Sequence, residues 1–291
     1  MNKSQLIVLA TALAATAALY YLVPTTKPKV SGAAAVSASP GGEQHQHNDS
    51  VFTIADYEFH ALEALSTERQ QYLNGLKAAV KRGDVKDQSL HLNHQLASFW
   101  KDSVPNPILY FYYQNSAARL ENTEKTLTFA AHSILGYLPY AENNPTQVWL
   151  ANTAKASFEN ALALNANNDS SIVGLGACIM FGADPGAEGP MAGILKVRSV
   201  VEKDSTNMFA QYMLGLGGLQ SRQLDKAILR FEKVAKAEPN NLEVLFKLAE
   251  TNELMGNKAK AADWYMVVLN KVEVPEMKEE LKKRIELLKK P

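Results

Sequence analysis

Two stretches of the chain decide the fold: LGLGGLQSRQLDKAILRF at residues 214–231 and LAETNELMGNKAKAADWY at residues 248–265. Each begins with a leucine and a small residue, and an alanine and an aromatic residue follow 12 and 16 positions after the small one. Corresponding residues are 34 positions apart, namely Leu214 and Leu248, Gly215 and Ala249, Ala227 and Ala261, and Phe231 and Tyr265. A period of this length, without alternating strand patterns, predicts repeated pairs of helices.

The residue types at these positions suit two packed helices joined by a turn. Small side chains would let the first helix of a pair approach the second, the aromatic side chains would fill the space between successive pairs, and Pro239 would end a second helix. The pattern resembles the tetratricopeptide repeat, which implies an all-α, right-handed superhelical solenoid with a protein-binding inner face. The sequence departs from that family in having Gln211 and Leu245 where it expects aromatic residues, and Glu273 where it expects proline.

Weaker copies of the pattern precede these two. Ala154, Phe158 and Ala161 repeat the second-helix spacing, so we expect a first helix over residues 123–138. Gly176 and Gly193 are 17 positions apart instead of 12, which predicts five extra residues in the turn at 181–191. Helices are also expected at 56–82, 85–102 and 107–121. A last apolar stripe predicts a C-terminal capping helix and consists of Met277, Leu281, Ile285 and Leu288.

An uncharged stretch near the N-terminus, LIVLATALAATAALYYLV at residues 6–23, predicts a single transmembrane helix, because about 20 apolar residues cross the hydrocarbon core. A cleaved signal peptide with its cleavage site at residues 33–35 is the alternative, although its apolar region rarely exceeds about 15 residues. Residues 25–50 are rich in Pro, Ser, Ala and Gly and predict a flexible linker. We therefore divide the chain into an anchor (1–24), a linker (25–50), an N-terminal helical region (51–122) and a solenoid with its cap (123–291).

The composition narrows the class of partner. The 30 Lys and Arg residues balance 30 Asp and Glu residues, giving a formal net charge of zero. Phosphate binding requires a clustered basic excess, so nucleic acid is not expected as a partner. The only cysteine, Cys178, excludes an internal disulfide and a cysteine-based zinc site, and it suits a small core position.

The family resemblance also places a binding groove on the first helices of successive pairs. Carried over onto this sequence, its positions fall on Val173 and Met180, on Phe209, Tyr212, Leu216 and Leu219, and on Phe246, Glu250 and Glu253. Such a groove is apolar in the middle and acidic at one end, unlike that of family members that clamp a C-terminal carboxylate with Lys, Arg and Asn. It would suit an apolar or amphipathic segment with basic flanks. The alternative is that the protein's own helices cover these side chains.

No motif in the sequence indicates catalysis, a metal or a cofactor. The glycines at 215–218 follow no predicted strand, and the loop at 181–191 lacks the Gly-Lys-Ser/Thr of a phosphate-binding loop. The weak signals that remain are two histidine pairs and one carboxylate pair: His45 with His47, His91 with His94, and Glu58 with Glu63.

Together these features predict a membrane-tethered scaffold, without enzymatic activity, that recruits other proteins. Lys3 leads the short N-terminal head, and the Ala/Ser/Pro-rich tether follows the anchor; we therefore expect the solenoid of an inner-membrane protein to lie in the periplasm. The architecture is similar to that of bacterial envelope-assembly and cytochrome c maturation repeat proteins. A helical enzyme with a site in residues 51–140 and a self-assembling structural protein are the alternatives.

Overall fold

The computed structural model describes residues 52–82, 86–138, 141, 144–182 and 189–290. These residues form thirteen α-helices and one π-helical turn, and they contain no strand. The elements are α2 (Ile54–Glu63), α3 (Thr67–Arg82), α4 (Lys86–Ser98), η1 (Phe99–Ser103), α5 (Pro107–Glu121), α6 (Glu124–Tyr137), α7 (Asn144–Leu164), α8 (Asp169–Phe181), α9 (Gly189–Lys203), α10 (Met208–Gln220), α11 (Leu224–Ala237), α12 (Leu242–Leu254), α13 (Lys258–Leu269) and α14 (Pro275–Lys289). The predicted all-α fold is confirmed for this part of the chain.

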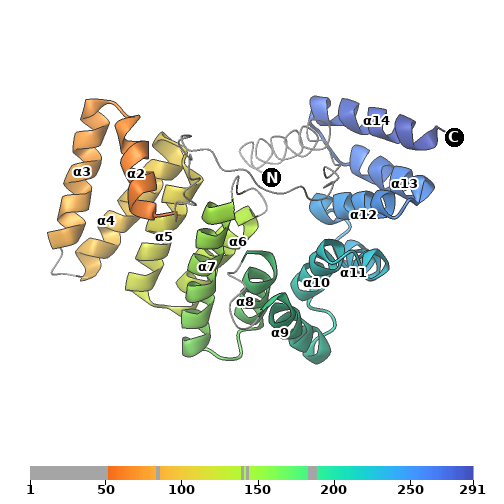
Figure 1. The fold of residues 1–291 in the computed structure, drawn as a ribbon, viewed down its shortest axis with the longest axis horizontal. Coiled ribbons are helices and arrows are strands. Elements are labelled where there is room, and N and C mark those ends of the chain that lie inside the picture. The colour runs from red at the N-terminus through yellow and green to blue at the C-terminus, as the bar shows by residue number, and fades with distance from the viewer. Residues whose placement is uncertain (1–51, 83–85, 139–140, 142–143, 183–188, 291) are drawn as a thin grey trace, which may run out of the picture.

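The helices pack as sequential pairs. α6 packs on α7, α8 on α9, α10 on α11 and α12 on α13, and each pair also contacts the next. Figure 1 shows the pairs following one another along an arc, with α6, α8, α10 and α12 on its inner side and their partners on its outer side. α8, α10 and α12 begin at residues 169, 208 and 242, so the last two starts are 34 residues apart and the first two are 39 apart. The structure therefore confirms the helix pairs that the 34-residue period predicted.

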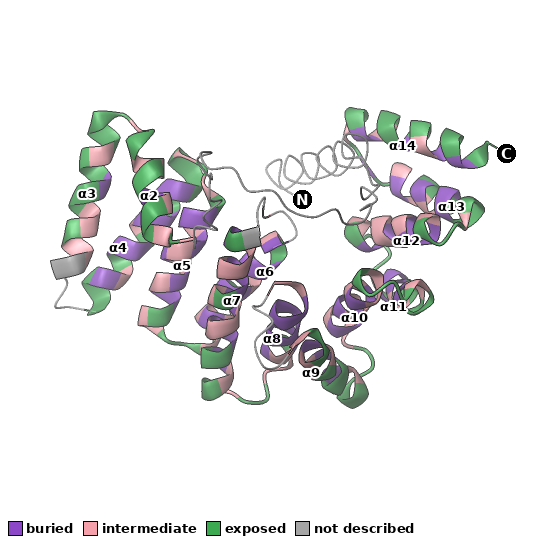
Figure 2. Cartoon of the chain, in the orientation of Figure 1, coloured by how far each residue is buried: buried purple, intermediate pink, exposed green. Residues whose placement is uncertain are grey.

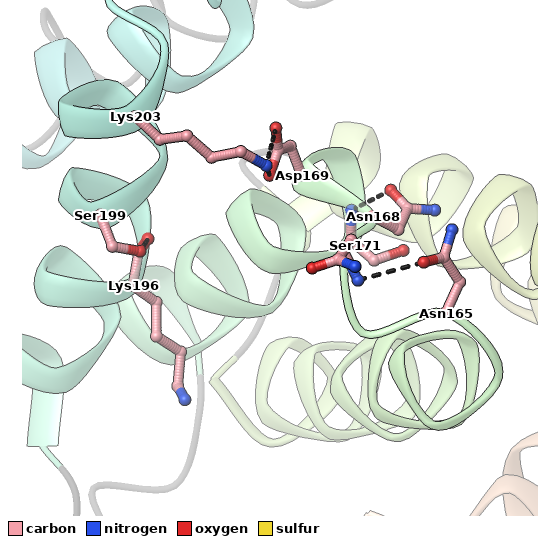
Figure 3. A network of polar contacts seen from close by, with 8 residues as sticks. Asn165, Asn168, Asp169, Ser171, Lys196, Ser199 and Lys203 are labelled. Atoms are coloured by element: carbon pink, nitrogen blue, oxygen red, sulfur yellow. Dashed lines mark hydrogen bonds and ion pairs between the residues drawn. The ribbon is translucent and has the colours of Figure 1, made fainter.

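An asparagine side chain caps the N-terminus of three of the inner helices, α8, α10 and α12. Asn168, Asn207 and Asn241 accept a hydrogen bond from the backbone N–H three residues later, at distances of 2.9, 2.9 and 3.3 Å. Asparagine is among the best N-cap residues because its side chain satisfies an N–H that lacks a helical partner. Figure 3 shows the first of these turns, where Lys203 of α9 also pairs with Asp169 of α8, 3.0 Å apart.

Small residues let the helices of a pair approach closely. A Cβ added to Gly215 of α10 would lie 2.5 Å from the Phe231 ring of α11. A Cβ on Gly176 of α8 would lie 2.7 Å from the carbonyl oxygen of Gly193 of α9. Real Cβ atoms do not come this close to other atoms, so each contact requires glycine.

The core is continuous along the array. One cluster of buried side chains centres on α7 and α8, and a second extends from α11 to α14. Tyr212 and Leu216 of α10 pack against both clusters, which joins them. The apolar stripe of α14 is buried against the second cluster, so this helix covers the last pair.

Two predicted helices differ from the observed ones. The helix expected at 56–82 is divided into α2 and α3 by residues 64–66, and Ser66 stands directly before α3, where hydroxyl side chains favour a helix start. The helix expected at 85–102 widens into η1 after Ser98. In this turn Phe99 and Trp100 are both buried, and their rings stack edge to face at 5.3 Å.

Several predictions concern residues outside the described part of the chain. The anchor at 1–24, the linker at 25–50 and the pair His45 and His47 all lie there. None of the helices that the structure describes has the length and hydrophobicity that crossing a bilayer requires.

Candidate protein-binding surface

The surface of interest is a line of half-buried side chains on the inner helices α10 and α12. We call it the inner surface, and it consists of Phe209, Tyr212, Leu216, Leu219 and Phe246. The four residues of α10 are spaced by three, four and three, which places them on one side of that helix. Phe246 of α12 packs against the same core cluster as Tyr212, Leu216 and Leu219. The inner helices α10 and α12 contact each other along this side: the Tyr212 hydroxyl of α10 donates a hydrogen bond to Glu243 of α12 at 2.5 Å.

Buried residues of the repeat support this surface from below. Phe231 of α11 and Tyr265 of α13 are buried, and their rings contact Tyr212 and Phe246 at centroid distances of 5.8 and 5.6 Å. The other residues singled out by the period are also placed: Gly215, Ala227, Leu248, Ala249 and Ala261 are buried, Leu214 is half-buried, and Pro239 is exposed just after α11. The partly exposed rings of the inner surface are thus held by fixed rings below them.

The inner side of α8 differs, and it corrects part of the predicted groove. Val173 and Met180 are 0% and 4% exposed, so they belong to the core. His132 of α6 covers this region, because its ring contacts Phe209 of α10 at 5.1 Å and its Nε2 lies 2.7 Å from the Ser170 hydroxyl of α8. Side chains from α6 and α10 therefore meet above the start of α8. Figure 2 shows α8 as largely buried.

The Met180 side chain is accommodated beside Gly217 of α10. A Cβ added to Gly217 of α10 would lie 2.5 Å from the Met180 terminal methyl carbon, so Met180 of α8 reaches into the space that Gly217 leaves. Burial also lowers the pKa of His132, which favours the neutral imidazole in the folded protein. The closure over the start of α8 therefore combines a ring contact with a hydrogen bond, and the neutral imidazole of His132 takes part in both.

The acidic end of the predicted groove is also changed by its surroundings. Glu250 pairs with Lys247 at 2.8 Å, one turn earlier on α12. Glu253 pairs with Arg284 of the capping helix, with 3.0 Å between Arg284 Nε and Glu253 Oε2. Both carboxylates thus have a cationic partner within the chain.

Four residues in or beside this region had no part in the groove predicted from the sequence. His132 and Arg284 act through contacts between distant helices and carry no local signal. Phe129 lies one turn before His132 on α6 and is 63% exposed. Gln211, which stands where the family has an aromatic residue, is buried and accepts a hydrogen bond from Arg230 at 2.6 Å.

The weak chemical signals do not form a site among the described residues. His91 and His94 are exposed, and no group of three metal-ligating side chains gathers in this part of the chain. Cys178 is buried, which raises the pKa of its thiol.

The carboxylate pair is divided between two environments. Glu58 is buried and links three helices, because it accepts a hydrogen bond from the Tyr113 hydroxyl of α5 and pairs with Lys77 of α3 at 2.6 Å. Burial and this hydrogen bond raise the pKa of Tyr113, so its hydroxyl stays protonated and continues to donate. Glu63 is exposed and pairs with His60. Glu58 therefore fastens α2 and α3 to α5.

Comparisons with known proteins concern the architecture alone. No family model and no curated protein matches this chain. Among solved structures it is similar to YrrB, described as a TPR protein with an unusual peptide-binding site, at 16% identity and a TM-score of 0.39 over 72% of this chain and 97% of that one. It is also similar to MamA from Desulfovibrio magneticus RS-1, at 19% identity and a TM-score of 0.41 over 62% and 94%.

A tetratricopeptide repeat protein from Parabacteroides merdae ATCC 43184 is similar at 14% identity and a TM-score of 0.39, over 76% of this chain and 87% of that one. At these identities and TM-scores, the likenesses say nothing about the ligand of this chain. The fold rests on its own helix pairs and their period.

Proposed function

We propose that this chain is a protein-binding scaffold of the tetratricopeptide type, which holds a segment of another protein against the inner surface of α10 and α12. The observation that carries the proposal is the row of partly exposed apolar side chains on these two helices. Tyr212, Leu216 and Phe246 keep part of their surface in water although they lie above a packed core. Partly exposed aromatic residues on a rigid support are typical of protein-binding surfaces.

The described residues favour binding over catalysis. The one buried carboxylate, Glu58, already has two partners, and the one cysteine is buried. The side chains of the inner surface are apolar, and they offer area to a partner instead of a reacting group. A helix laid along neighbouring inner helices would cover them, as in other grooves that bind amphipathic helices.

We further propose that residues 6–23 hold this scaffold at the inner membrane, with the repeats in the periplasm and a role in assembling envelope complexes. The support is compositional: 18 consecutive residues without charge, followed by a linker of small and polar residues. A reporter enzyme that is active on only one side of the membrane, fused after residue 40, tests the orientation. Activity restricted to the periplasm is expected, and activity in the cytoplasm would contradict the proposal.

The binding function is tested with the full chain in membranes by chemical crosslinking followed by mass spectrometry. Phe246→Ser removes an inner-surface ring, whereas Leu229→Ser changes an outer-side leucine of α11 that is 66% exposed. We expect partners captured by the wild type to be lost with Phe246→Ser and retained with Leu229→Ser. Equal capture by the two variants would place binding elsewhere on the molecule.

A further inference from the structure

The carboxylates beside the inner surface already have hydrogen-bond or ion-pair partners within the chain. Three carboxylates of α12 lie there, and each has a partner. Glu243 accepts a hydrogen bond from the Tyr212 hydroxyl at 2.5 Å. Glu250 and Glu253 pair with Lys247 and Arg284, as described above.

The pair at Glu253 is the more strongly held of the two ion pairs. Two nitrogens of Arg284 bond its two carboxylate oxygens, since Nε lies 3.0 Å from Oε2 and Nη2 lies 2.5 Å from Oε1. The Tyr265 hydroxyl donates to the same carboxylate at 3.2 Å. A two-point contact between guanidinium and carboxylate is among the strongest polar contacts in proteins because its geometry is fixed.

Both ion pairs are partly shielded from water. The side chains of Glu253 and Arg284 are 22% and 28% exposed, and those of Glu250 and Lys247 are 29% and 30% exposed. A cationic ligand would have to displace Lys247 or Arg284, or bind beside a like charge in surroundings that screen it less than bulk water. The neighbouring side chains of the inner surface, Leu216, Leu219 and Phe246, offer only apolar contact.

We propose that the inner surface of α10 and α12 selects an apolar helical segment with uncharged flanks, and that Lys247 and Arg284 set this specificity by occupying the carboxylates that would otherwise attract cationic flanks. The inference rests on the proposed function of the same surface. It replaces the sequence-based expectation of a basic-flanked partner, because that expectation counted Glu250 and Glu253 as free charges. Leu254, 50% exposed at the end of α12, extends the apolar area past Glu253.

Two fluorescent 16-residue helical peptides test the specificity against the full chain in nanodiscs, with empty nanodiscs as the blank. Both carry the same leucine and alanine face, and their ends carry either glutamine or lysine. We expect the glutamine peptide to bind about fivefold more tightly, which corresponds to about 1 kcal/mol. Its affinity should change less than about twofold between 50 and 300 mM NaCl, because no net charge pairing contributes.

The double variant Lys247→Gln/Arg284→Gln frees both carboxylates and should remove or reverse the preference. The matched control, Lys247→Arg/Arg284→Lys, keeps both charges and should retain a preference for the glutamine peptide. Circular dichroism identifies any variant that does not fold. If a variant is lost in this way, the comparison of the glutamine and lysine peptides on the wild-type chain still tests the proposed specificity.

The outcomes separate this inference from the proposed function. Tighter binding of the lysine peptide by the wild type would overturn the inference, while loss of that binding in Phe246→Ser would leave the proposed function standing. Binding of both peptides that is unaffected by Phe246→Ser would contradict both. A molecular mass that rises with concentration in the wild type but not in Phe246→Ser would show that a second copy of the chain occupies the surface, and that would also overturn the inference.

Discussion

The inner helices α8 and α10 occupy equivalent places in successive pairs, yet they present opposite surfaces. On α8 the inner-facing positions Val173 and Met180 are buried: His132 and Phe209 meet above the start of that helix, and the Met180 side chain fills the space beside Gly217 of α10. On α10 the equivalent side of the helix leaves Tyr212 and Leu216 half-exposed. The repeat pattern therefore sets the position of an inner helix, whereas side chains of the neighbouring helices determine which face of that helix stays exposed.

The largest expected effect tests whether the two regions share the same kind of core. Phe158 lies below Gly174 of α8, and Phe231 lies below Gly215 of α10. Phe158→Ala and Phe231→Ala should each lower the free energy of unfolding by about 3–5 kcal/mol, because both rings are fully buried. Urea unfolding followed by circular dichroism measures this. Phe129→Ala, at an exposed ring, should cost less than about 0.5 kcal/mol.

A smaller effect should separate the closed region from the open one. Val173→Ser places a hydroxyl at a fully buried position and should cost about 2–3 kcal/mol. Leu219→Ser changes a half-buried side chain of α10 and should cost about 1 kcal/mol. The same urea titration compares them, and equal costs would mean that α10 is as closed as α8.

The smallest effect concerns the closure over α8 and depends on pH. Burial lowers the pKa of His132 from its ordinary value of 6.5, so the unfolded chain binds a proton more readily than the folded one. This contribution to stability is complete above pH 6.5 and is lost as the pH falls from there through the lower pKa of the folded state. Urea midpoints at pH 7.5 and 5.0 should therefore differ more for the wild type than for His132→Gln. The same difference in both proteins would assign the pH dependence to other groups.

The sequence was sufficient for the architecture because packing of a helix pair depends on residues close together in the chain. Gly215 and Phe231, 16 positions apart, carry the periodic signal and contact each other within one pair, although the pattern had placed the Phe231 ring between successive pairs. The apolar stripe of α14 likewise predicted its buried face. The asparagines at 168, 207 and 241 carried a further signal, since each directly precedes an inner helix and caps it, with the last two 34 residues apart.

The burial and the charge of the candidate surface could not be predicted from residues close together in the chain. The closure of α8 depends on a contact between His132 and Phe209, 77 positions apart and on helices of different pairs. The charge of Glu253 is balanced by Arg284, which lies on the capping helix outside the two clear repeats. Neither residue belongs to the repeat pattern, so family positions alone did not indicate that Val173 is buried and that Glu253 is paired.

Site-specific photocrosslinking shows whether a partner protein contacts the inner surface. A photoreactive phenylalanine replaces Leu216 on the inner side of α10 in one full-length protein and Leu229 on the outer side of α11 in another, and both are irradiated in membranes. We predict adducts with a partner protein from position 216 and none from position 229. Adducts from position 229 alone, or equally from both, would contradict the assignment of binding to the inner surface.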